Sequence, residues 1–271
     1  MSEFDPKNIY EAVPDSSLDQ ERARLRSFDL PTQVSVQAIG SLDNDSVLLD
    51  VGSGENPGLK TYAQAEGARY IAIDIRPKAL TEQHDQHAIA VQADARTLPI
   101  AESVIDVAPS RFVLAHFTNK EDRKKIVKEA FRVVTPGGKA VFIDYDWTAM
   151  RGSSSLIRLR DFTLGNISIF DAGYGVDSKQ EIGRFLDNKA VIEELRVSPP
   201  ILQDYESVLA LRQVTLRALR QQTASQNLID EANAIFDGIQ AESTLENPPG
   251  FHMPDMVGVI CHQAYSHVLH A

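Results

Sequence analysis

The sequence predicts an α/β protein built on a doubly wound, mostly parallel β-sheet. Short apolar segments alternate with helical patterns between residues 47 and 145. This order produces a parallel sheet that is covered by helices on both faces. A glycine-rich turn, Gly52-Ser53-Gly54, stands directly between the first apolar segment and the next helix. Such a turn is expected where a buried strand ends at the ligand-binding edge of a parallel sheet.

The core strands are expected to be short and apolar. They cover residues 47–51, 70–74, 88–92, 104–108 and 140–145. Asn56-Pro57 is expected to begin the helix after the first strand, with Asn56 as its cap, and Gly67 to end it. The segment from Thr118 to Glu121 has the spacing of a capping box, and Pro136-Gly137-Gly138 is expected to end the helix that it opens.

The remaining segments are expected to be mainly helical. Helices are predicted over residues 16–28 and 33–39, before the first strand. Residues 153–190 have a mostly helical pattern, and residues 206–222 form an amphipathic helix. Two further strands are expected over residues 192–197 and 257–262.

Charge and cysteine content exclude several classes of protein. The 271 residues contain 27 Lys and Arg against 38 Asp and Glu, which gives a net charge of −11. An acidic surface repels phosphate backbones, so we expect no nucleic-acid binding. Cys261 is the single cysteine, which excludes a disulfide framework and a thiolate-rich site, and we expect no metal.

No apolar run reaches the roughly 18 residues of a membrane span, and the N-terminal segment does not resemble a secretory signal. We therefore expect a cytoplasmic protein.

Acidic residues lie at the ends of three successive predicted strands. Asp50 opens the segment that contains the glycine turn, Asp74 ends the second strand, and Asp94 follows the third. Asp74 is placed to accept hydrogen bonds from a ribose diol, and Asp94 could meet an adenine edge. Taken singly, each feature is also explained by a tight turn or a helix cap. Together, at the carboxyl ends of parallel strands, they predict a nucleotide-binding crevice.

Five segments occur in the order typical of one enzyme family. They are VLLDVGSGENPG, YIAIDI, VQADARTLPI, VIDVAPSRFVLAHF and EAFRVVTPGGKAVFIDYDW. Over residues 45–147 the chain resembles class I S-adenosylmethionine-dependent methyltransferases of the small-molecule type. The resemblance implies a Rossmann-like sheet in a single domain over residues 1–271. Residues 1–44 would form lid helices, residues 45–147 the cofactor-binding core, residues 148–256 an acceptor cap with one core strand, and residues 257–271 the last strand and tail.

The resemblance also implies which residues bind S-adenosylmethionine. The methionine part would lie over the first glycine turn and beside the end of the fourth strand, the ribose at the second strand and the adenine at the third. The implied cofactor-binding residues are Asp50, Gly52, Ser53, Gly54, Asp74, Ile75, Asp94, Ala95, Ser110 and Arg111. Asn56 departs from the family pattern, because it stands where a third glycine is usual.

The acceptor is expected between the segments that follow the fourth and fifth strands. Phe112, Tyr145 and Trp147 are candidate acceptor-binding residues, since flat rings stack on planar molecules. His116 and Asp146 are candidate catalytic residues that could remove a proton. Core packing of Trp147, a backbone hydrogen bond of His116 and a capping role of Asp146 remain open alternatives.

The sequence thus predicts methyl transfer to an oxygen, nitrogen or carbon of a small organic acceptor, as in secondary metabolism. The alternatives are a quinone-precursor methyltransferase, an NAD-dependent oxidoreductase and a non-catalytic cofactor-binding protein. The oxidoreductase is disfavoured because Pro57 stands at the position of its third glycine and has no N–H to offer a pyrophosphate. Neither the acceptor nor the oligomeric state follows from the sequence.

Overall fold

The computed structural model describes residues 30–81, 83, 88–117, 119–166, 178–187, 189–198, 212, 215–216, 219–220, 224–242 and 255–264. The helix predicted over residues 16–28 lies outside these residues, as does most of the helix predicted over residues 206–222.

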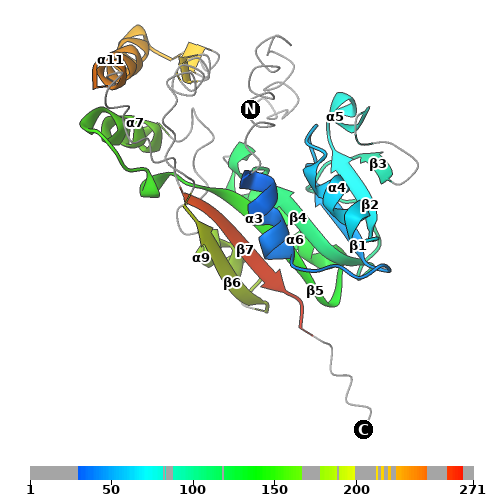
Figure 1. Cartoon of the computed structure of the whole chain (residues 1–271). Coiled ribbons are helices and arrows are strands. Elements are labelled where there is room, and N and C mark those ends of the chain that lie inside the picture. The colour runs from blue at the N-terminus through cyan, green and yellow to red at the C-terminus, as the bar shows by residue number, and fades with distance from the viewer. Residues whose placement is uncertain are drawn as a thin grey trace, which may run out of the picture.

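Seven strands form a single sheet with the order β3-β2-β1-β4-β5-β7-β6 (Figure 1). Their bounds are β1 Val47–Val51, β2 Arg69–Asp74, β3 Ala88–Gln92, β4 Ile105–Arg111, β5 Val134–Asp146, β6 Val191–Val197 and β7 Asp255–His262. Strands β1 to β5 pair in parallel, while β7 runs antiparallel to both β5 and β6. The predicted doubly wound, mostly parallel α/β fold is confirmed.

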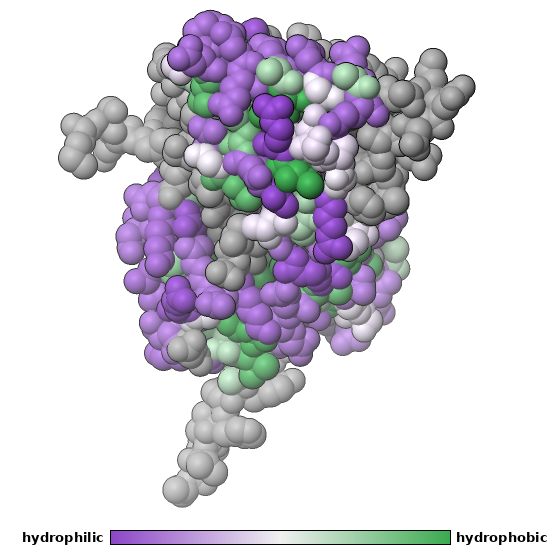
Figure 2. All heavy atoms as spheres, turned by 90° about the vertical axis from the view of Figure 1, so that its left-hand side faces the viewer, coloured by the Kyte–Doolittle hydropathy of each residue, from purple (hydrophilic) through white to green (hydrophobic). Residues whose placement is uncertain are grey.

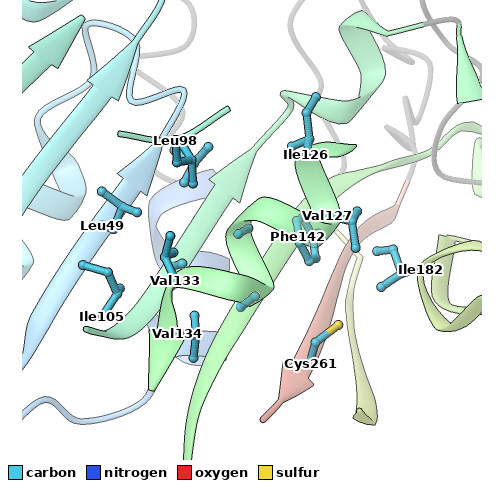
Figure 3. Close-up of a cluster of buried hydrophobic side chains, with 14 of the residues drawn as sticks. Leu49, Leu98, Ile105, Ile126, Val127, Val133, Val134, Phe142, Ile182 and Cys261 are labelled. Atoms are coloured by element: carbon cyan, nitrogen blue, oxygen red, sulfur yellow. The ribbon is translucent and has the colours of Figure 1, made fainter. Parts of the chain in front are cut away.

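Helices cover both faces of this sheet. The helices are α3 Leu30–Ile39, α4 Gly58–Ala65, α5 Pro77–Thr81, α6 Lys120–Val133, α7 Ser154–Gly165, α9 Ser178–Phe185 and α11 Gln226–Glu242, with 3-10 turns η1 Leu114–His116 and η2 Trp147–Ala149. On one face, Leu49 and Phe142 of the sheet pack with Ile126 of α6 and Ile182 of α9 (Figure 3). Helices α3, α4 and α5 contribute to a second apolar cluster with the other face.

The Pro136-Gly137-Gly138 segment does not end a helix, as the sequence had suggested. Helix α6 ends at Val133, and strand β5 begins at the next residue and runs through the three positions. The N–H of Gly137 donates to the carbonyl of Gln263, whose own N–H donates to Gly138, both over 3.0 Å. The pairing register with β4 shifts in the same region. The glycines therefore accommodate an irregularity inside the strand.

Two other boundaries also differ from the predicted ones. Asn119 caps α6, because its side chain accepts a hydrogen bond from the N–H of Glu121 over 2.9 Å; Thr118, the cap expected from the sequence, lies outside the described residues. Strand β4 continues through Pro109 as far as Arg111. Helix α4 begins at Gly58 with Pro57 at its N-cap position, so Asn56 is not the cap that was predicted, although its side chain accepts a hydrogen bond from the N–H of Gly58 over 2.9 Å.

Helices α7 and α11 pack on each other beyond the end of β5 (Figure 1). Their ends are joined by Glu242, which accepts hydrogen bonds from the hydroxyls of Ser154 and Ser155 over 2.7 and 2.9 Å. Trp147 in η2 packs against the apolar cluster of this helix pair. Figure 2, viewed from the side that carries these two helices, shows a mainly hydrophilic surface with small hydrophobic patches. Among the described residues, no helix is both long enough and apolar enough to cross a bilayer.

Candidate active site

The glycine turn after β1 is fixed to the end of β2. Gly52 and Gly54 have φ angles of 70° and 59°, which lie in the left-handed region that favours glycine. The N–H groups of Gly52 and Ser53 both donate to the carbonyl of Ile73, over 2.7 and 2.9 Å. A Cβ atom on Gly52 would lie 2.2 Å from Cγ2 of Val113. Only glycine therefore allows this turn to pass so close to the segment that follows β4.

Asp74 connects the glycine turn to the end of β2. Its carboxylate is 7% exposed, and one oxygen accepts from the N–H of Gly54 over 2.9 Å. The other oxygen accepts from the N–H of Arg76 over 2.9 Å and lies 3.4 Å from Nε of the same residue. A carboxylate offers about four lone-pair sites, so Asp74 keeps acceptor capacity for a ligand after these contacts.

A pocket opens at the carboxyl ends of β1, β2, β3 and β4. Its lining residues are Gly52, Ile73, Asp74, Ile75, Arg76, Ala93, Asp94, Ala95, Arg111, Val113, His116 and Phe117. It brings together seven of the predicted site residues, from Gly52 to His116. Arg76 and Phe117 are among the lining residues that were not predicted, because no sequence pattern distinguishes them.

Asp50 lies beneath the pocket and is fully buried. Its Oδ2 accepts hydrogen bonds from the hydroxyl of Tyr70 and from the guanidinium of Arg111, both over 2.9 Å. Burial raises the pKa of Asp50, and the charge of Arg111 offsets this only in part. Burial also raises the pKa of Tyr70 well above its usual value. Asp50 thus supports Arg111, which lines the pocket, rather than lining it directly.

Asp94 is bound by a neighbouring arginine. Both of its oxygens accept hydrogen bonds from Arg96, the shortest over 2.7 Å. Burial raises the pKa of Asp94, but the hydrogen bonds from Arg96 outweigh it, so this pKa lies below its usual value. The same guanidinium bonds to Asp122 of α6 over 3.3 Å and lies 5.6 Å from the ring centre of Phe117. Arg96 therefore fixes Asp94 and Phe117 at the third-strand end of the pocket.

The two candidate catalytic residues lie in different surroundings. His116 ends η1 and lines the pocket. Burial and the nearby charge of Arg76 lower the pKa of His116 to about 4, so its ring is neutral at pH 7. Asp146 caps η2 through the N–H of Thr148 over 3.0 Å and pairs with Arg196 of β6 over 2.5 Å. The capping alternative for Asp146 is therefore present in the structure.

The three candidate acceptor-binding rings form a continuous row. Phe112 and Tyr145 stack with ring centres 4.8 Å apart, and Trp147 meets Tyr145 edge-on at 6.1 Å. Phe112 has a φ of 58°, an unusual value for a bulky residue, and its N–H donates to the carbonyl of Ile143 over 2.8 Å. The row runs from the sheet core to the α7 and α11 pair.

Asp144 is a buried carboxylate in this region that the sequence interpretation missed. One oxygen accepts from the N–H of Tyr145 over 2.8 Å. The other oxygen has no hydrogen-bond partner among the described residues. Burial raises the pKa of Asp144 to about 7, although the backbone N–H groups of Tyr145 and Ala115 lower it.

Residues 49–142 match the family model of a methyltransferase domain. Over this segment the chain is similar to methyltransferase domains. The matched segment runs from β1 to β5 and contains every lining residue of the pocket.

The chain is similar to proteins that act on different acceptors. It is 33% identical over 117 residues to a tRNA (carboxymethyluridine(34)-5-O)-methyltransferase of Arabidopsis thaliana, covering 43% of this chain and 28% of that protein. It is 25% identical to malonyl-[acyl-carrier protein] O-methyltransferase of Marinomonas, covering 69% of each. A structure of phosphoethanolamine N-methyltransferase 2 of Haemonchus contortus shares the fold, with a TM-score of 0.53 at 15% identity over 88% of this chain and 53% of that one. The chain spans 28% and 45% of the first two curated relatives.

Proposed function

We propose that this chain transfers the methyl group of S-adenosylmethionine to an oxygen, nitrogen or carbon atom of a small organic acceptor. The observation that carries the proposal is the position of Asp74. Its carboxylate stands at the end of β2, bonded to the glycine turn, and faces a pocket that lies within the matched methyltransferase segment. A ribose diol supplies the donors that the remaining lone pairs of Asp74 can accept.

The other side chains of the pocket suit the rest of this cofactor. Ile75, Ala95 and Phe117 offer apolar walls to an adenine ring. Beneath the pocket, Asp50 Oδ1, Ser53 Oγ and Ser110 Oγ are buried acceptors without a hydrogen-bond partner among the described residues. None of the three lines the pocket, whereas the guanidinium of Arg111 does and suits a carboxylate. These contacts supply binding and orientation.

When bound, S-adenosylmethionine supplies an electrophilic methyl group on a positively charged sulfur. The contribution of the chain is then positioning, because the acceptor atom, the methyl carbon and the sulfur must lie in line. The aromatic row of Phe112, Tyr145 and Trp147 provides flat surfaces for an acceptor next to the pocket. His116 is the residue proposed to accept a proton, since its ring is neutral at pH 7. Asp146 is proposed to keep the end of β5 in place through Arg196 and Thr148.

The start of α4 argues against the NAD-dependent alternative. Pro57 has no N–H, and the N–H of Gly58 is already bonded to the side chain of Asn56. A pyrophosphate needs free N–H groups at this helix start. S-adenosylmethionine carries no pyrophosphate, so the loss does not affect its binding.

Isothermal titration calorimetry with S-adenosylmethionine, S-adenosylhomocysteine and NAD tests the cofactor. We expect binding of the first two and none of NAD. Tighter binding of NAD, or no binding of either adenosyl compound, would overturn the proposal.

Transfer of radioactive methyl groups tests the acceptor class. The protein would be incubated with labelled S-adenosylmethionine and, separately, with small-molecule extract and with total tRNA from the same cells. The net charge of −11 favours the small molecules. Label in the tRNA fraction alone would place the chain with its Arabidopsis relative instead.

The proposed cytoplasmic location is supported by the single, buried thiol and is tested by fractionation of the producing cells.

A further inference from the structure

Asp144 differs from every carboxylate described around the site. Asp50 is paired with Arg111, Asp94 with Arg96, Asp146 with Arg196, and Asp74 has Arg76 beside it. Among the described residues, Asp144 forms no ion pair, and its Oδ2 accepts no hydrogen bond although it is buried. An unsatisfied buried oxygen lowers stability, and such groups gather at functional sites.

Asp144 lies between η1, which ends at His116, and the rings of Tyr145 and Trp147 at the end of β5. Successive side chains of a strand point to opposite faces, so Asp144 shares a face with Phe142, which packs toward α6. Segment η1 also packs against β5, and the backbone N–H of Ala115 in η1 is one of the groups that lower the pKa of Asp144. The next residue of η1 is His116. On its other side, Asp144 accepts from the N–H of Tyr145, whose ring meets Trp147.

The charged groups on the surrounding elements already have partners. Arg111 on β4 bonds to Asp50, Asp146 on β5 pairs with Arg196, and Asp255 on β7 accepts from Ser198. His116 on η1 interacts electrostatically with Asp74 and Arg76. Among the described residues, burial and the two backbone N–H groups are what act on the titration of Asp144.

We propose that Asp144 is a positioning residue: when ionised, it holds η1, and with it His116, against the end of β5, and when protonated it loosens this contact. An ionised carboxylate accepts N–H hydrogen bonds more strongly than a neutral carboxyl group does. That this part of the molecule binds an acceptor rests on the proposed function. The coupling between Asp144, His116 and Trp147 does not depend on that function. The burial that raises the pKa of Asp144 to about 7 places this change near neutral pH.

The test compares the natural protein with Asp144→Asn between pH 5.5 and 8.5. Asparagine keeps the shape and one acceptor oxygen, and it removes the buried charge, so the variant is expected to fold. Trp147 is the only tryptophan, so its fluorescence reports on the end of β5. The second measurement is the affinity for S-adenosylhomocysteine, because His116 lines the pocket. Asp106→Asn is the matched control, since Asp106 accepts a backbone N–H bond from Val47 over 2.8 Å at the opposite end of the sheet.

We expect the fluorescence of the natural protein and of Asp106→Asn to change with a midpoint near pH 7, and that of Asp144→Asn to stay constant. Site-to-site coupling of typical strength would change the affinity for S-adenosylhomocysteine by about fivefold or more over this range, and this change should also vanish in Asp144→Asn. Persistence of both transitions in Asp144→Asn would assign them to a histidine and overturn the proposal, as would flat profiles in the natural protein. If no S-adenosylhomocysteine binds, the proposed function fails, and the fluorescence of the free protein still decides the role of Asp144.

Discussion

The guanidinium of Arg111 and the carboxylate of Asp50 lie 2.9 Å apart below the glycine turn, with exposed fractions of 6% and 0%. The hydroxyl of Tyr70 shares the same carboxylate oxygen. The three side chains come from β4, β1 and β2, so they connect three neighbouring strands at the edge where the pocket opens. A buried charge pair of this kind makes each partner dependent on the other.

We therefore expect Arg111→Met to lower the free energy of unfolding by roughly 3–5 kcal/mol, because it leaves the Asp50 charge buried without its partner. Urea denaturation measures the change. Arg160→Met is the control, since Arg160 pairs with the exposed Asp161 and such surface pairs contribute about 1 kcal/mol or less. A variant Arg111→Met as stable as the natural protein would mean that the pair is not important for folding.

Asp74→Ala should weaken binding of S-adenosylhomocysteine by roughly one to two decades, since a hydrogen bond to a charged group contributes about 1.5–3 kcal/mol. Calorimetry gives the dissociation constant. Asp45→Ala, at an exposed turn before β1, should bind as the natural protein does. An unchanged constant in Asp74→Ala, together with reduced stability, would leave Asp74 with a structural role in holding Gly54.

His116→Ala should lower turnover by roughly two to four decades, the range typical of a general base, while the affinity for S-adenosylhomocysteine stays within a factor of about three. Steady-state kinetics with the acceptor found in the labelling experiment measures this. Full activity of the variant would exclude His116 from proton transfer, and positioning alone would then account for the rate.

The stability of the fold should depend on the ionisation of Asp144. Its pKa is about 7 in the folded protein, against an ordinary value of 3.8. The folded state therefore binds the proton more tightly, and this contribution is complete below pH 4 and is lost as the pH rises through 7. Because one pKa unit corresponds to 1.36 kcal/mol, the loss is roughly 4 kcal/mol. Urea denaturation at pH 5 and 8 should show the part of this loss that falls between pH 5 and 7, about 3 kcal/mol for two pKa units, in the natural protein and a smaller decrease in Asp144→Asn. Equal decreases in the two proteins would contradict the assignment.

Cys261 should not react with thiol reagents in the folded protein. It is buried in the core between β7 and α6 (Figure 3), and burial raises its pKa to about 12. Ellman's reagent should label one thiol per chain only after denaturation. Rapid labelling of the native protein would indicate that β7 opens readily.

Much of the fold follows from local patterns. Apolar runs bounded by turns gave the bounds of β1 and β3 as the structure has them. The end of α6 was misjudged because proline and glycine usually end helices, and here pairing with β4 and β7 keeps the segment in a strand. Such pairing depends on residues distant in the sequence.

The candidate site was predicted less completely than the fold. Residues at strand ends, such as Asp74 and Asp94, were identified because the topology places them at one edge. Arg76 and Phe117 were missed, since only the packing of separate segments brings them to the pocket. Asp144 could have been found: it alternates with Ala140 and Phe142 in an apolar strand, a position where a carboxylate would be buried.

The segment between β5 and β7 carries α7 and α11, together with α9 and the edge strand β6. Strand β5 ends at Asp146 and β7 begins at Asp255, and these two residues face each other in the pairing register. Arg196, near the end of β6, contacts both carboxylates. Because the ends are held together by the sheet itself, a segment of different length between them would change little in chain closure. We therefore expect chimeras joined at these positions, in which β6 is exchanged together with the helices, to keep the pairing of β1 to β5 and β7.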